Sequence, residues 1–174
     1  MDIFLEYIVP RKKGTKEIIK IAAILVALFF LFSVCTIIMF TVLSGLALPI
    51  LAGGLYGAYY FITAQNVEYE YIVTNGELDV DTIIHRRKRK RIITVHSRTF
   101  DIVAPCGDKE FAGEENGSFT KVIDASSGYN NDKAYFAVFS KDGMRIKLVF
   151  EPTDKMLDAF KTFVPRNVHK RAEV

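Results

Sequence analysis

The sequence predicts an α+β protein: a two-helix transmembrane hairpin followed by a β-barrel or sandwich of about seven strands, with a C-terminal amphipathic helix. Three observations support this prediction. Residues 21–67 contain no Asp, Glu, Lys, Arg or His. Apolar and polar residues alternate after that stretch, which is typical of strands. Near residue 155 the apolar spacing changes to that of a helix.

The length of the uncharged stretch predicts two membrane crossings. One crossing needs about 20 helical residues, so the stretch is too long for one span and suits two spans with a turn. Residues that punctuate helices gather between its apolar halves, and we expect the turn within residues 41–49. The alternative is a buried helical hairpin of a soluble protein, but such helices carry a polar face and these segments have none.

Flanking charges predict the orientation of the hairpin. Basic residues precede the first span, the turn is uncharged, and a basic segment follows the second span. Because cationic loops stay in the cytoplasm, we expect a multi-pass protein of the cell membrane with both termini cytoplasmic. Tyr56, Tyr59 and Tyr60 are expected either to form an aromatic belt at the inner interface or to pack against the first helix.

Small residues of the second span predict close helix packing. Gly53 and Gly57 are four residues apart, and Gly54 and Ala58 repeat that spacing, which allows helix backbones to approach in lipid. We expect the partner to be the face of the first helix with Ala23 and Ala27, which have the same spacing; a second copy of the chain would use the same chemistry. The spans contain no ionisable residue, which favours an anchor over a transporter or channel.

The sequence before the first span, MDIFLEYIVP, mixes apolar and acidic residues. We expect either a short amphipathic helix on the membrane surface, ended by Pro10, or a disordered start. The expected layout is therefore a juxtamembrane segment (1–17), the transmembrane hairpin (18–65), a cytoplasmic domain (66–165) and a frayed tail (166–174).

The clearest unit of the cytoplasmic domain is a β-hairpin in VEYEYIVTNGELDVDTII. Asn75-Gly76 is a strong signal for a type I′ turn. Closing the hairpin there places an apolar set on one face and an acidic set on the other. The apolar pairs are Val73 with Leu78, Tyr71 with Val80 and Tyr69 with Thr82, and the acidic set is Glu68, Glu70, Glu77, Asp79 and Asp81.

Further strands are expected in RIITVHS, RTFDIVAP, KVIDAS, KAYFAVFS and MRIKLVFE, with a surface loop over residues 106–118. Lys141-Asp142-Gly143 lies between the last two and indicates a second hairpin. PTDKMLDAFKTFV then predicts an amphipathic helix that packs on the sheet.

The order of these elements resembles bacterial pleckstrin-homology (PH)-like domains. VEYEYIVTNGELDVDTIIHRRKRKRIITV is similar to their opening: a tyrosine-bearing strand, a tight turn, a second strand, a basic segment and an aliphatic strand. The whole chain resembles an uncharacterised family of short two-span membrane proteins of Gram-positive bacteria. The resemblance implies a PH-like fold at a membrane and implies no activity.

The basic run is the main candidate binding site. It consists of Arg86, Arg87, Lys88, Arg89, Lys90 and Arg91. Cations near an inner membrane surface are attracted to anionic headgroups, so the run is a candidate contact for anionic lipid or an acidic partner. Two alternatives remain: the run only sets orientation, or alternate residues of a basic strand neutralise Glu70 and Asp81, leaving about half of the run free.

No motif predicts catalysis, and we expect a non-enzymatic protein without cofactor or metal. His85, His96 and His169 have no metal-ligand spacing, and Cys35 and Cys106 lie in different parts of the chain. The basic run lacks interleaved aromatic residues and the net charge is only +3, so no nucleic-acid partner is expected. We expect a membrane-anchored binding or scaffold module whose partners are the lipid bilayer and, as an open option, another membrane protein or a second copy. The alternative is an accessory subunit of a larger membrane complex.

Overall fold

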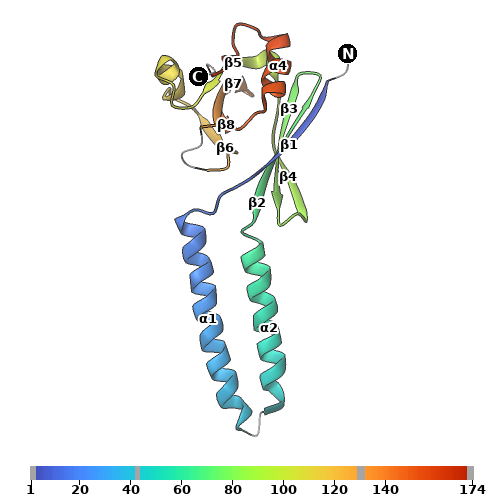
Figure 1. Ribbon diagram of the computed structural model, residues 1–174, viewed down its shortest axis with the longest axis vertical. Helices are drawn as coiled ribbons and strands as arrows, with labels where there is room; N and C mark the ends of the chain where they lie inside the picture. Colours follow the sequence, from blue (N-terminus) through green and yellow to red (C-terminus); the bar gives the residue numbers. More distant parts are fainter. Residues whose placement is uncertain (1–2, 42–43, 129–131, 172–174) are drawn as a thin grey trace. The chain divides into compact units, whose positions relative to one another are not determined.

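The computed structural model describes residues 3–41, 44–128 and 132–171 (Figure 1). Contacts divide the chain into two compact units. One is Lys12–Val67, and the other combines Met1–Arg11 with Glu68–Val174. The N-terminal residues thus belong to the same unit as the C-terminal part of the chain, and the helices are inserted between the first two strands. The predicted boundaries at residues 17 and 66 do not follow this division.

The first sheet has the strand order β1-β2-β3-β4. Its strands are β1 (Phe4–Pro10), β2 (Val67–Thr74), β3 (Glu77–Ile84) and β4 (Lys88–His96).

Strand β1 corrects the expectation of a surface helix or a disordered start. It pairs antiparallel with β2, with Leu5 opposite Val73, and every second residue of β1 falls opposite an apolar residue of β2. Val9 is buried on this apolar face. The residues therefore alternate with the period of a strand. The expectation of a short amphipathic helix in MDIFLEYIVP is therefore wrong.

The predicted hairpin at Asn75-Gly76 is confirmed. Both residues have positive φ (49° and 87°), as a type I′ turn requires. The turn is also anchored: Ser97 donates its N–H to the carbonyl of Gly76, and the ring of Phe163 lies against the Gly76 Cα. Five of the six predicted apolar residues are buried, and Thr82 is half-buried.

The second sheet has the order β5-β7-β8-β6, with β6 parallel to β8. Its strands are β5 (Phe100–Pro105), β6 (Lys121–Asp124), β7 (Tyr135–Lys141) and β8 (Met144–Phe150). A turn at Asp142-Gly143 joins β7 to β8 as predicted. The domain thus has two separate four-stranded sheets, not a closed barrel, and β1 brings the described strands to eight where about seven were expected.

The helix α4 (Asp154–Phe163) closes the core as predicted. The Thr153 hydroxyl accepts the N–H of Met156 and caps the helix. Phe160 is fully buried and packs edge-on against Phe100, with Phe150 nearby. In the same domain, the hydroxyl of Tyr71 donates to the carbonyl of Ala125 and links β2 to the end of β6.

The segment after α4 corrects the expectation of a frayed tail for residues 166–171; the rest of the predicted tail, 172–174, lies outside the described residues. Val103 donates its N–H to Asn167, and its carbonyl accepts the N–H of His169. The side chain of Asn167 donates to the carbonyl of Phe100 at 2.7 Å, and Val168 is buried. Residues 167–169 are therefore bound to the edge of β5.

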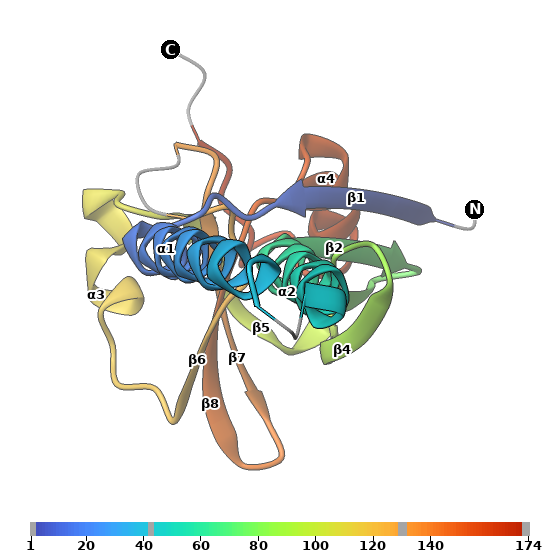
Figure 2. The ribbon, with the colours of Figure 1, turned by 90° about the horizontal axis from the view of Figure 1, so that it is seen from below.

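The second unit is a pair of helices, α1 (Thr15–Met39) and α2 (Ser44–Thr63), that lie side by side (Figures 1 and 2). Both are long and apolar enough to cross a membrane. The turn is shorter than the predicted 41–49, because α2 already begins at Ser44 and includes Pro49. Pro49 lies in the second turn of α2 and has no N–H to donate to the carbonyl of Gly45, four residues earlier.

The interface between α1 and α2, here called the seam, contains one of the two small-residue pairs of α2 and not the other. Gly54 faces α1, where an added Cβ would lie 2.0 Å from a methyl carbon of Leu31, and Ala58 is buried in the same seam. A Cβ added at Gly53 or at Gly57 would meet nothing within 4 Å among the described residues. The expected partner face on α1 is wrong, because Ala23 and Ala27 are exposed. Other buried or half-buried apolar residues of α1 are Ile21, Ile24, Leu28, Cys35 and Ile38.

Candidate functional site: the basic run of the first sheet

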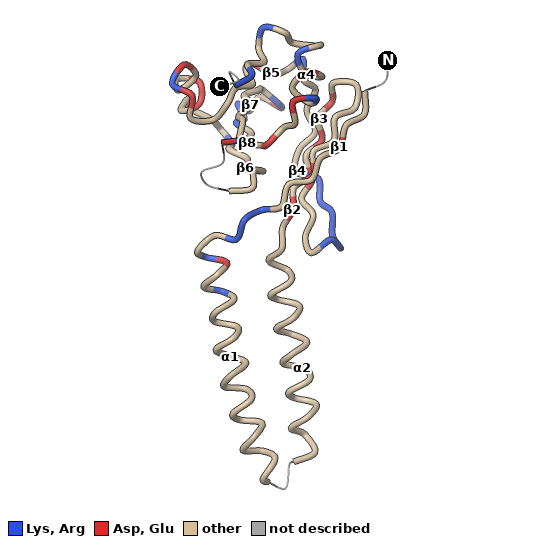
Figure 3. The backbone as a smooth tube through the Cα atoms, viewed as in Figure 1, with Lys and Arg blue, Asp and Glu red and all other residues tan. Residues whose placement is uncertain are grey.

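The basic run occupies the β3–β4 turn and the first half of β4. Arg86 and Arg87 lie in the turn, and the remaining four residues begin the strand, as the charge pattern in Figure 3 shows. His85 and Arg86 both have positive φ (52° and 55°). Left-handed conformations cost non-glycine residues about 1–2 kcal/mol each. The turn therefore holds basic residues where glycine or asparagine would be less strained.

Three arginines of the run are paired with carboxylates of the sheet. Arg89 Nη2 lies 2.6 Å from Glu70 Oε1, and Arg86 Nε lies 3.3 Å from Glu68 Oε1. Arg91 contacts Asp81, which lies opposite it in the β3–β4 register. It also reaches Asp79, with Nη1 2.6 Å from Oδ1. These contacts match the alternative in which alternate residues of the basic strand neutralise the acidic face.

The acidic face is less exposed than the sequence suggested. Glu70 is fully buried and Asp81 is 2% exposed. Burial raises the pKa of Glu70 above its ordinary value, and the hydrogen-bonding carboxyl of Glu6 on β1 raises it further, whereas Arg89 lowers it. Glu6 was not among the predicted site residues, because β1 was not predicted.

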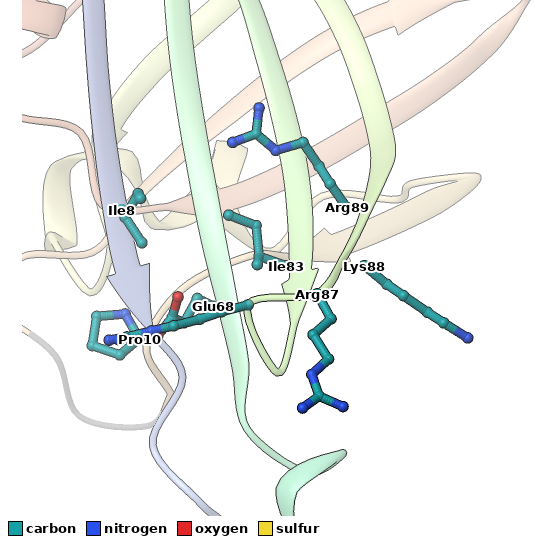
Figure 4. A pocket seen from close by; sticks show the side chains of 8 residues that line it. Ile8, Pro10, Glu68, Ile83, Arg87, Lys88 and Arg89 are labelled. Carbon is teal, nitrogen blue, oxygen red and sulfur yellow. The ribbon is translucent and has the colours of Figure 1, made fainter.

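The other half of the run extends into solvent. Arg87, Lys88 and Lys90 are exposed, and none of them forms an ion pair within residues 3–41, 44–128 and 132–171. Figure 4 shows the side chains of Arg87 and Lys88 directed away from the strands, while Arg89 turns back over them. Three cations are thus available for an anionic ligand.

A groove of about 610 Å³ adjoins the run at one edge of the sheet (Figure 4). Apolar residues from β1 and β3 form part of its wall: Ile8, Pro10 and Ile83. Pro10 lies opposite Glu68 in the sheet, and Glu68 contacts Arg86. The end of β1, the start of β2 and the β3–β4 turn therefore share one edge.

The described residues give little support for metal binding or thiol chemistry. Among the residues that the structure describes, no group of three or more His, Cys, Asp or Glu side chains is arranged to hold a metal ion. Burial raises the pKa of Cys106 to about 12, with the nearby Glu115 adding to the effect, so the reactive thiolate is disfavoured. Cys35 is buried in the helix seam.

Two four-stranded sheets with a C-terminal helix packed on the core define a PH-like domain. The family described as Bacterial PH-like domain (DUF6106) matches residues 1–170, and the chain belongs to this family. The match includes β1 and both long helices. Comparisons with curated proteins and with solved structures find no match.

Proposed function

We propose that this protein is a membrane-anchored, non-enzymatic binding or scaffold module that presents its PH-like domain at the inner surface of the cell membrane. In this proposal, α1 and α2 cross the bilayer, and the basic run contacts anionic lipid headgroups. The observation that supports this proposal most directly is the location of the run. It lies at the edge of the first sheet where β1 ends before α1 and β2 begins after α2.

The pairing of β1 with β2 supports the proposed topology. β1 precedes α1 and β2 follows α2, and the two strands form one sheet. Two strands of one sheet must lie on the same side of a membrane. A hairpin that crosses the bilayer therefore has both of its ends on that side. The lysines and arginines before α1 favour the cytoplasmic side.

Short connections join the first sheet to the two helices. Residues 11–14 connect β1 to α1, and residues 64–66 connect α2 to β2. A connection of this length spans less than about 20 Å. The last residue of β1 and the first residue of β2 are therefore tethered to the helices by no more than this length of chain. Long arginine and lysine side chains shorten the remaining gap to a headgroup.

Unpaired cations supply the attraction. Each Lys or Arg close to an anionic surface contributes on the order of 1 kcal/mol. Arg87, Lys88 and Lys90 thus give roughly 3 kcal/mol before screening. This energy is enough to hold a domain that is already tethered, and it should weaken strongly in high salt.

Lysine labelling in nanodiscs tests the proposal with the full-length chain. The chain is placed in discs of phosphatidylcholine alone or with phosphatidylglycerol, and the acylation rates of Lys88 and Lys90 are measured by mass spectrometry relative to the exposed Lys121. We expect several-fold slower acylation of Lys88 and Lys90 in the anionic discs. High salt should remove the difference.

A charge-reversed variant provides the matched control. Arg87→Glu should reduce the protection of both lysines, whereas Lys109→Glu, in the short 3-10 helix Lys109–Phe111, should leave it unchanged. Equal acylation rates in the two lipid compositions would show that the run does not contact headgroups. Protection that appears only when another membrane protein is added would favour the accessory-subunit alternative.

A further inference from the structure

A buried carboxyl group adjoins the basic run. Glu70 is on the face of β2 opposite the core, yet it is fully buried by its neighbours. Its Oε1 accepts a hydrogen bond from Arg89 Nη2 at 2.6 Å. Its Oε2 has no N–H or hydroxyl donor among the described residues. The carboxyl of Glu6 is the hydrogen-bonding neighbour that remains.

The sheet register explains this arrangement. Glu6 is opposite Ile72 and Ile8 is opposite Glu70, so Glu6 and Glu70 are diagonal neighbours on one face of the β1–β2 pair. Two carboxyl groups in contact cannot both ionise easily, and they form a hydrogen bond when they share a proton. Glu6, Glu70 and Arg89 therefore form a cluster in which two acids compete for one cation.

Other charged groups around Glu70 are largely compensated. Asp81 on β3 faces Glu70, but Arg91 on β4 binds it and Asp79. Glu68, on the same strand as Glu70, is paired with Arg86. Glu6 on β1 and Arg89 on β4 thus remain the groups whose balance changes when Glu70 gains or loses a proton.

We infer that the cluster of Glu6, Glu70 and Arg89 makes headgroup contact by the basic run dependent on protons, with stronger contact at lower pH. This inference rests on the proposed function. With both acids ionised, the two carboxylates and the guanidinium of Arg89 carry one net negative charge. With one proton shared by the two acids, the cluster is neutral.

The location of Arg89 connects this proton to the lipid contact. Arg89 lies between Lys88 and Lys90, and its side chain is 54% exposed. The net negative charge that the proton removes therefore lies within the basic run, next to its unpaired cations. One additional elementary charge close to an anionic surface changes the binding constant about fivefold. The pKa of Glu70 is raised by its burial, so this proton is gained at a higher pH than by a glutamate in water.

The nanodisc labelling experiment tests the inference when it is repeated from about pH 5 to pH 8. The parent chain carries His85→Asn, which removes the imidazole next to the run, and asparagine tolerates the positive φ at this position. The measured quantity is the acylation rate of Lys88 and Lys90, relative to Lys121, in anionic discs divided by that in neutral discs. We expect protection in anionic discs to increase about fivefold from the highest to the lowest pH.

Two variants and one control separate the possible outcomes. Glu70→Gln mimics the protonated acid and should hold protection near its low-pH level throughout, and Glu6→Gln should reduce the dependence on pH as well. Glu77→Gln, an exposed acid at the other end of β3, should titrate like the parent. If Glu70→Gln and Glu6→Gln both titrate like the parent, the inference is wrong although the proposed function stands. If anionic discs give no protection at any pH, the proposed function fails and the inference fails with it.

Discussion

Gly76 shows how one residue fixes the position of the first hairpin against α4. Its φ of 87° favours glycine, and an added Cβ would lie 2.6 Å from the ring of Phe163. Phe163 is in turn contacted edge-on by His96 and covered by the guanidinium of Arg98. The ring is held from both sides, so it has little freedom to move away from a new methyl group.

We therefore predict that Gly76→Ala destabilises the domain more than a glycine substitution with backbone strain alone. Gly143 is the matched control: its φ is 74°, but an added Cβ there would meet nothing within 4 Å. Gly143→Ala should cost about 1–2 kcal/mol of unfolding free energy, from the left-handed backbone. Gly76→Ala should cost at least about 1 kcal/mol more because of the clash with Phe163. Chemical denaturation measures both, and equal losses would contradict the role of Phe163.

The β3–β4 turn presents the opposite case at the residue scale. His85 and Arg86 have positive φ, which is uncommon for residues other than glycine, although histidine adopts it more often than most. Strained residues of this kind often occur at functional sites. The sequence gives no turn signal here because glycine and asparagine are missing, and its charge pattern alone marks the segment.

At the scale of elements, the α1–α2 seam separates two motifs that look equivalent in the sequence. The Gly54 and Ala58 pair faces Leu31 and its neighbours, whereas Gly53 and Gly57 are open. A large side chain in the seam forces the helices apart, and one on the open face does not.

We predict that Gly54→Leu weakens the helical hairpin and that Gly53→Leu does not. In nanodiscs, the melting temperature of the full-length chain should fall with Gly54→Leu and change little with Gly53→Leu. Leu31→Ala should restore part of the loss, because it removes the side chain that meets residue 54. A loss of similar size from Gly53→Leu would mean that the open face binds a second helix.

The elements with local signals were predictable, and those that depend on distant partners were not. The Asn75-Gly76 hairpin and α4 were predicted because a turn dipeptide and a helical period lie within a few residues. β1 was missed because its partner strand lies beyond both long helices. The binding of Asn167 to β5 has no local signal. For the site, the pairing of Arg89 and Arg91 followed from strand alternation, but the pairing of Arg86 with Glu68 depends on a turn that the sequence does not announce.

At the scale of the whole molecule, the domain is assembled from two separate stretches of chain. β1 is an edge strand, and all of its residues are paired with β2. Its Val9 contributes to the buried face of the sheet. A fragment of residues 66–165 lacks this strand, and it also lacks residues 167–169, which bind to β5. Both losses leave backbone groups of the sheets without partners.

We predict that residues 1–10, joined by a short glycine-containing loop to residues 68–174, form a soluble and cooperatively unfolding domain. Pro10 and Glu68 are opposite each other, so a tight loop replaces the helices without distorting the sheet. The fragment 66–165 should unfold at a clearly lower temperature or bind a dye for exposed apolar surface. Circular dichroism melting distinguishes them, and a fragment 66–165 as stable as the joined domain would show that β1 is dispensable.

The pairing of β1 with β2 also dictates an order of events during synthesis. Phe4 leaves the ribosome long before Thr74, the residue opposite it in the sheet. At about 5–20 residues per second, β1 waits on the order of 3–15 s for its partner. Both helices emerge during this interval, so β1 cannot join the sheet before they have been made. A nascent chain stalled inside α2 should therefore expose its first ten residues to protease, and release of the completed chain should protect them.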